Sequence, residues 1–167
     1  MIRGCYKFNS YPCISDGGQD AKTSKFITLL GSGAILTEVI QAAQLLARQG
    51  ISVDVFSVTS WSELARDGQA CCQRAQNGVA GESQALVARC LQGSQGHLIA
   101  ATDYVRAVPE SVRAYLPEGR SYVTLCTDGF GRSDTRAALR GFFSVDAASI
   151  AQVAKTLLDR AVGKPGY

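Results

Sequence analysis

Short apolar runs alternate with segments of helical spacing along most of this 167-residue chain. Such a run is typical of a strand that is buried on both faces of a parallel sheet. The segments between the runs repeat apolar side chains every three or four positions, as amphipathic helices do. Alternating strands and helices predict a three-layer α/β/α domain over residues 26–167, with a mostly parallel sheet of about five strands. The apolar runs predict four of these strands, at residues 26–30, 52–58, 97–101 and 122–126.

Capping signals set the helix boundaries. Gly50 follows the first helical segment where a left-handed C-cap is easiest. Ser60 and Glu63 have the spacing of a capping box, and Asp134 and Asp146 stand where N-caps of the last two helices are expected. The predicted helices are residues 34–48, 61–66, 83–91, 103–115 and 134–142, and a final one after 146 with Ile150, Val153, Ala154, Leu157 and Leu158 on one face.

Residues 1–25 differ in character from the rest of the chain. They contain Pro12, Gly17 and Gly18 together with several Ser, Asp and Asn residues, a composition that favours turns over packed elements. We therefore predict an N-terminal arm and loop that leads into the domain.

Composition narrows the class of protein. The net charge is only +3 and the 17 Lys and Arg residues are scattered, so we expect no nucleic-acid binding. No apolar run approaches the ~20 residues of a membrane span, and the N-terminal residues lack the apolar stretch of a signal peptide. These features predict a cytoplasmic protein that does not enter a membrane. The six cysteines are expected to be reduced and mostly buried. If any pair is exposed, we expect it to be Cys71 and Cys72, which lie in a polar stretch.

The loop Gly31-Ser32-Gly33 follows the first predicted strand and precedes a helix. Amide groups in such a loop favour an anion. A dinucleotide fingerprint would place a third glycine at position 36, where this chain has Leu36, and Asp54 lies inside its strand instead of at the end. A tight strand-to-helix turn is the simpler interpretation, with a small-anion site at Gly31, Ser32 and Gly33 as the alternative.

A second polar loop, residues 127–134, follows the last predicted strand. Charges alternate in sign along it, at Asp128, Arg132, Asp134 and Arg136, which predicts an ion network that holds the loop against a neighbour. Catalysis would need a nucleophile with a matched base, yet His97 is the only histidine and opens a strand away from these loops. The sequence favours docking over catalysis here and indicates no catalytic, cofactor-binding or metal-binding residue.

Several motifs, in order along the chain, resemble the homodimeric pyruvate dehydrogenase decarboxylating component of bacteria. The resemblance covers most of the chain, although residues 9–24 and 71–81 depart from the family pattern. The motifs are GCYKF (4–8), LLGSG (29–33), VTSWSELARDG (58–68), IAATDYVRAVPE (99–110), TDGFGRSDTR (127–136) and FSVD (143–146).

The resemblance implies a function for a larger enzyme, an oxidoreductase with three α/β domains. Its first two domains bind thiamine diphosphate and magnesium, and this chain corresponds to the third, transketolase-like C-terminal domain. The whole enzyme decarboxylates pyruvate and acetylates the lipoyl group of a dihydrolipoyl acyltransferase partner. Asp16-Gly17-Gly18 only superficially resembles the cofactor-binding motif.

On this basis the chain is expected to be inactive alone and to support packing on the parent's other domains and on its homodimer mate. A standalone regulatory, anion-binding module is the alternative. We expect exposed apolar surface near Phe130. The expected docking residues are Thr102, Asp103, Tyr104, Asp128, Phe130, Arg132, Ser133, Asp134 and Arg136.

Overall fold

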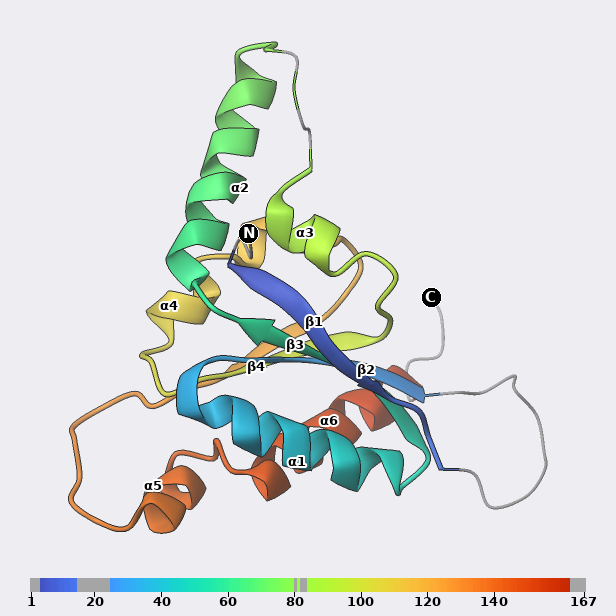
Figure 1. The fold of residues 1–167 in the computed structure, drawn as a ribbon, viewed down its shortest axis with the longest axis vertical. Coiled ribbons are helices and arrows are strands. Elements are labelled where there is room, and N and C mark those ends of the chain that lie inside the picture. The colour runs from blue at the N-terminus through green and yellow to red at the C-terminus, as the bar shows by residue number, and fades with distance from the viewer. Residues whose placement is uncertain (1–3, 15–24, 80, 82–83, 163–167) are drawn as a thin grey trace.

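A five-stranded sheet forms the centre of the computed structural model, which describes residues 4–14, 25–79, 81 and 84–162 (Figure 1). The strand order is β1-β3-β2-β4-β5, and every neighbouring pair is parallel except β1 with β3. The predicted α/β class and mostly parallel sheet are therefore confirmed. The strands are β1 (Cys5–Tyr11), β2 (Lys25–Gly31), β3 (Ile51–Val58), β4 (His97–Ala101) and β5 (Tyr122–Leu125).

Helices cover both faces of the sheet, as predicted (Figure 1). Helix α1 (Leu36–Ala47), preceded by the short helix η1 (Gly33–Ile35), packs with α6 (Ala147–Val162) on one face. The other face is covered by α2 (Trp61–Gln76), α3 (Leu86–Cys90) and the segment around Val112. Successive residues of β2 serve the two faces, with Leu29 in one core and Leu30 in the other, because side chains alternate along a strand. Within the described residues, no helix is long and apolar enough to cross a bilayer.

The strand β1 lies within the segment that the sequence predicted as an arm and loop. It pairs antiparallel with β3 at the edge of the sheet, and Lys7 forms an ion pair with Asp54, with 2.8 Å between Nζ and Oδ1. Only Cys5 of this strand is fully buried, so its sequence lacks the apolar run that marks the other strands. Residues 1–3 and 15–24 of the predicted arm, with Asp16-Gly17-Gly18, lie outside the described residues.

Helix α2 begins as predicted and extends ten residues beyond the predicted end at residue 66, to Gln76. The Ser60 side chain accepts a hydrogen bond from the Glu63 amide, which confirms the N-cap half of the capping box. The buried positions of the added turns are Gly68 and Cys71. Because these side chains are small, hydrophobic spacing understated the length of the helix.

Three other predicted helices differ from the structure. Residues 103–115 form the short helices α4 (Ala107–Glu110) and η2 (Arg113–Tyr115) instead of one helix. The described part of the helix predicted from residue 83 is α3, and residue 83 lies outside the described residues. Helix α5 (Arg136–Phe142) is capped by Thr135, not Asp134, since the Thr135 hydroxyl accepts from the Ala138 amide. Gly50 has the expected positive φ, at 78°.

Candidate functional site

The loops that follow β2 and β4 meet at the carboxyl edge of the sheet. The chain leaves β2 toward β3 on one side of this point and leaves β4 toward β5 on the other side. Ligands usually bind at such a point in open α/β sheets. Here it is closed by side chains. The Ser32 and Thr102 hydroxyl oxygens lie 2.6 Å apart, both residues are buried, and Trp61 Nε1 donates to Ser32 Oγ at 3.2 Å.

The predicted anion loop is part of this closed junction. The Ser32 amide donates to the Ala101 carbonyl at 3.4 Å. Gly33 has φ of 55°, and a Cβ at that position would lie 3.3 Å from Asp103 Oδ1. Gly31 packs closely against Leu36 and Val39 of α1. A carboxylate beside Gly33 repels anions, so the geometry favours a tight turn here, and the anion site remains a prediction.

The loops that follow β4 and β5 are joined by hydrogen bonds. Thr127 Oγ1 donates to the Asp103 carbonyl at 2.6 Å, and the Thr127 amide donates to the Tyr104 carbonyl at 3.2 Å. The Asp128 carboxylate accepts from the Arg106 amide at 2.8 Å and from Arg106 Nε at 3.2 Å. These bonds bring Asp103, Tyr104 and Asp128 of the predicted docking set together. The role of Arg106 was missed, because its partner lies 22 residues away in the sequence.

Beyond Asp128 the loop leaves the body of the protein (Figure 1). Every residue from 128 to 138 is exposed, including the predicted docking residues Arg132, Ser133, Asp134 and Arg136. The Phe130 side chain is 98% exposed, and Tyr104, Val105 and Phe142 are also exposed. Phe130 is thus exposed, and an unusually large apolar patch around it stays a prediction.

Asp128, Arg132, Asp134 and Arg136 do not pair with one another, so a network that holds the loop against a neighbour stays a prediction. Asp128 pairs with Arg106 instead, and the Arg132 guanidinium stacks 4.0 Å from the centroid of the Phe142 ring. Asp134 accepts from the amide of the next residue. The loop projects outward, which leaves its charges in solvent, and Arg136 has no ion-pair partner among the described residues.

Helix α5 is fixed to the body by Glu38 of α1. The Glu38 carboxylate accepts from Arg140 Nη1 at 2.6 Å and from the Ala147 amide, at the start of α6, at 2.9 Å. One acidic side chain thus connects three helices. No local sequence pattern predicts this contact, because 102 residues separate Glu38 from Arg140.

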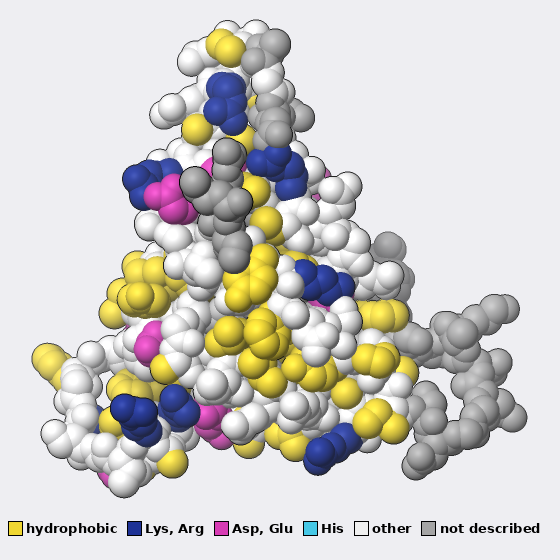
Figure 2. All heavy atoms as spheres, viewed as in Figure 1, with side chains coloured by type: hydrophobic (Ala, Val, Ile, Leu, Met, Phe, Trp, Pro, Cys, Tyr) yellow, Lys and Arg dark blue, Asp and Glu magenta, His cyan; other side chains and the backbone are white. Residues whose placement is uncertain are grey.

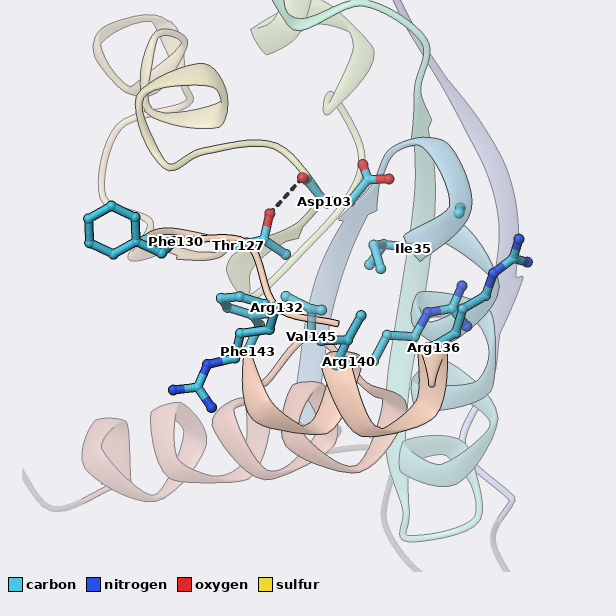
Figure 3. A pocket seen from close by; sticks show the side chains of 13 residues that line it. Ile35, Asp103, Thr127, Phe130, Arg132, Arg136, Arg140, Phe143 and Val145 are labelled. Atoms are coloured by element: carbon cyan, nitrogen blue, oxygen red, sulfur yellow. Dashed lines mark hydrogen bonds between the residues drawn. The ribbon is translucent and has the colours of Figure 1, made fainter. Parts of the chain in front are cut away.

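A cavity of about 530 Å³ lies between η1 and α5. Figure 3 shows Arg136 and Arg140 extending from α5 toward α1, while Phe130 points away from them. The lining residues are Ala34, Ile35, Asp103, Thr127, Gly129, Phe130, Gly131, Arg132, Arg136, Leu139, Arg140, Phe143 and Val145.

Metal-ligating side chains do not cluster in the part of the chain that the structure describes. No group of three or more His, Cys, Asp or Glu side chains there could hold a metal ion. Burial raises the pKa of the Cys5 thiol to about 12 and that of Cys126 to about 11, which suppresses the reactive thiolates. Of the pair predicted to be exposed, Cys72 is exposed and Cys71 is buried.

Comparison with known proteins identifies relatives of this chain. The family model of the transketolase-like C-terminal domain matches residues 18–146. The pyruvate dehydrogenase E1 component of Mycobacterium tuberculosis is 38% identical over 151 residues, which are 89% of this chain and 15% of that protein. The Pseudomonas aeruginosa E1 component is 48% identical over 123 residues, 72% of this chain and 14% of that protein. The chain thus spans less than a fifth of the length of these relatives.

Solved structures agree on the fold. A transketolase from Leishmania mexicana superimposes with a TM-score of 0.56 at 17% identity, covering 95% of this chain and 18% of that one. A split-gene transketolase gives a TM-score of 0.52 at 18% identity, with 83% and 41% coverage. The family match over residues 18–146, more than half of the chain, shows that this chain belongs to the transketolase-like C-terminal domain family.

Proposed function

We propose that this chain acts as the docking domain of a pyruvate dehydrogenase E1-type enzyme, through the loops that follow β4 and β5. The observation that carries the proposal is the exposure of Phe130 at 98%, in a segment whose residues 128–138 are all exposed. Burying one such side chain contributes about 1.5–3 kcal/mol. A projecting, fully exposed aromatic side chain is typical of an interface anchor.

In this proposal the partners are the other domains of the parent enzyme and its homodimer mate. The parent, a cytoplasmic oxidoreductase, decarboxylates pyruvate and acetylates the lipoyl group of the acyltransferase component. Thiamine diphosphate and magnesium belong to the parent's other domains. The described residues do not fit a magnesium–diphosphate site, because they hold no metal-ligating cluster, and Asp103 places a carboxylate beside the glycine-containing turn. We therefore assign this chain no catalytic step.

Reconstitution tests the docking role. The first two domains of the P. aeruginosa relative would be mixed with this chain, and association measured by analytical ultracentrifugation. We expect a complex that Phe130→Ser weakens at least tenfold, equivalent to about 1.4 kcal/mol. Phe8→Ser, at a 44% exposed aromatic of β1, is the matched control and should bind like the wild type.

Calorimetry with thiamine diphosphate and Mg²⁺ addresses the absence of a catalytic role. The isolated chain should show no heat of binding. Micromolar binding of the cofactor by the chain alone would overturn the proposal, as would equal association of the Phe130→Ser and wild-type chains.

A further inference from the structure

The cavity between η1 and α5 has one apolar region and one basic region. Ile35 and Val145 are 3% and 1% exposed, so their side chains form a fixed apolar floor together with Phe143 and Leu139. Its volume, about 530 Å³, lies within the range of small-molecule sites, which is roughly 300–1,000 Å³. Size and lining are thus sufficient for an organic ligand with an apolar body.

Three arginines of the α5 region line the same cavity, and they differ in how their charge is compensated. Arg140 is paired with Glu38. Arg132 stacks on the Phe142 ring, and its guanidinium points away from those of Arg136 and Arg140 (Figure 3). Arg136 has no ion-pair partner in the described part of the chain. Lys and Arg side chains gather over α5 in the space-filling view (Figure 2).

One acidic side chain, that of Asp103, also lines the cavity. It comes from the loop after β4 and lies beside Gly33, away from the arginines of α5 (Figure 3). Counting Glu38 with its partner Arg140, three arginines face two carboxylates, which leaves one positive charge in excess. The excess is concentrated at α5, and Asp103 disfavours an anionic group at the η1 wall.

We propose that this cavity binds a small organic carboxylate that has an apolar body. Arg136 holds the carboxylate through charge-assisted hydrogen bonds, and the body lies on Ile35, Phe143 and Val145. Asp103 orients the ligand by repelling its anionic end toward α5. The inference concerns this chain by itself and does not rest on the docking function.

Hexanoate is the probe, with the ¹⁵N-labelled full chain observed by NMR. Acetate supplies the charge without the body, and hexan-1-ol the body without the charge. We expect saturable hexanoate shifts at the amides of Ile35, Leu139 and Phe143, and affinities at least fivefold lower for both comparison ligands.

Variants of the chain identify the residues that interact with the carboxylate of hexanoate. Arg136→Gln should weaken hexanoate binding about tenfold, and Asp103→Asn should tighten it about twofold. Arg66→Gln, at an exposed arginine of α2, is the matched control and should leave the affinity unchanged. Both Arg136 and Arg66 are exposed, so neither change is expected to unfold the chain.

The proposal is overturned if hexan-1-ol binds as tightly as hexanoate, which would make the site merely apolar. It also fails if Arg136→Gln binds hexanoate like the wild type, or if the shifts map outside the cavity. Tyr104→Ser separates this inference from the docking function, because Tyr104 is a predicted docking residue that is 54% exposed and does not line the cavity. This variant should bind hexanoate like the wild type even if it associates less well with the parent's domains.

Discussion

The hydroxyl groups of Ser32 and Thr102 share a buried hydrogen bond, with 2.6 Å between the oxygens. It joins the loops after β2 and β4, at the junction where open α/β sheets commonly bind ligands. Trp61 Nε1 donates to the same Ser32 oxygen at 3.2 Å, so three elements meet at one buried polar atom. A junction filled by its own side chains provides a rigid base for the projecting loops.

Replacing Thr102 by Val should destabilise the protein by about 1–2 kcal/mol, because Ser32 loses a buried partner while the side-chain volume is kept. Equilibrium unfolding in urea, followed by the fluorescence of Trp61, the single tryptophan, measures this. Thr59→Val, at an exposed threonine, is the control and should stay within about 0.5 kcal/mol. Equal midpoints for the two variants would show that the hydrogen bond contributes nothing.

The Glu38–Arg140 pair should contribute more than an exposed pair. Its side chains are 13% and 24% exposed, and Glu38 also accepts from the Ala147 amide. We expect Glu38→Ala to cost about 1–3 kcal/mol, with a coupling energy to Arg140→Met near 1 kcal/mol in a double-mutant cycle. The exposed Glu63–Arg66 pair is the matched comparison, and its coupling energy should be about 0–1 kcal/mol. A coupling energy no larger than that of the exposed pair would contradict the anchoring role.

Gly96 precedes β4 with φ of 76°, and a Cβ there would lie 1.8 Å from the Phe26 carbonyl oxygen. Gly96→Ala should therefore destabilise the fold by about 3 kcal/mol or more, because backbone must shift to admit the methyl group. Gly93→Ala is the control, at φ of 83° with no atom within 4 Å, and should cost only about 1–2 kcal/mol. Thermal unfolding followed by circular dichroism distinguishes the two variants. Similar losses of stability would show that the positive φ, and not the clash with Phe26, accounts for both.

Cys72 should react first with a thiol reagent at pH 8. It is the exposed member of the described cysteines, whereas burial raises the pKa of Cys5 to about 12 and that of Cys126 to about 11. Time courses with dithiobis(nitrobenzoate) should show one fast thiol, which Cys72→Ser removes. Persistence of the fast phase in that variant would place the reactive thiol elsewhere.

The sequence was sufficient to predict the central strands, because β2 and β4 are buried on both faces and therefore almost continuously apolar. The edge strand β1 was missed for the same physical reason, since only Cys5 in it is fully buried. Helix α2 was underestimated because Gly68, which contacts the Tyr115 ring, supplies no hydrophobic signal. Sequence periodicity reports burial by large side chains and does not detect packing that uses small ones.

The candidate site was predictable in its parts but not in its assembly. Phe130 was identified because it lies in the polar, glycine-containing loop 127–134, and Arg136 because it continues the charge alternation of that loop. The cavity also depends on Ile35, which lies about 100 residues earlier in the chain than α5, and on the hydrogen bond from Arg140 of α5 to Glu38. Alternating charges suggested an ion network that holds the loop against a neighbour, whereas Asp128 pairs with Arg106 across two strand ends. Such partners depend on strand order, which local patterns do not encode.

The pH dependence of stability should contain a contribution from Glu110. Arg113 donates to its carboxylate, with Nη2 2.8 Å from Oε1, and this bond holds the pKa of Glu110 below its usual value of 4.5. A lowered folded-state pKa stabilises the protein above the unfolded pKa, and that stability is lost as pH falls through the folded pKa. Wild type should therefore exceed Glu110→Gln in urea midpoint at pH 6, and the difference should shrink steadily toward pH 3. In Arg113→Gln, NMR titration should place the Glu110 pKa nearer its usual value. A midpoint difference that stays constant from pH 6 to pH 3 would show that the carboxylate charge is not what stabilises this contact.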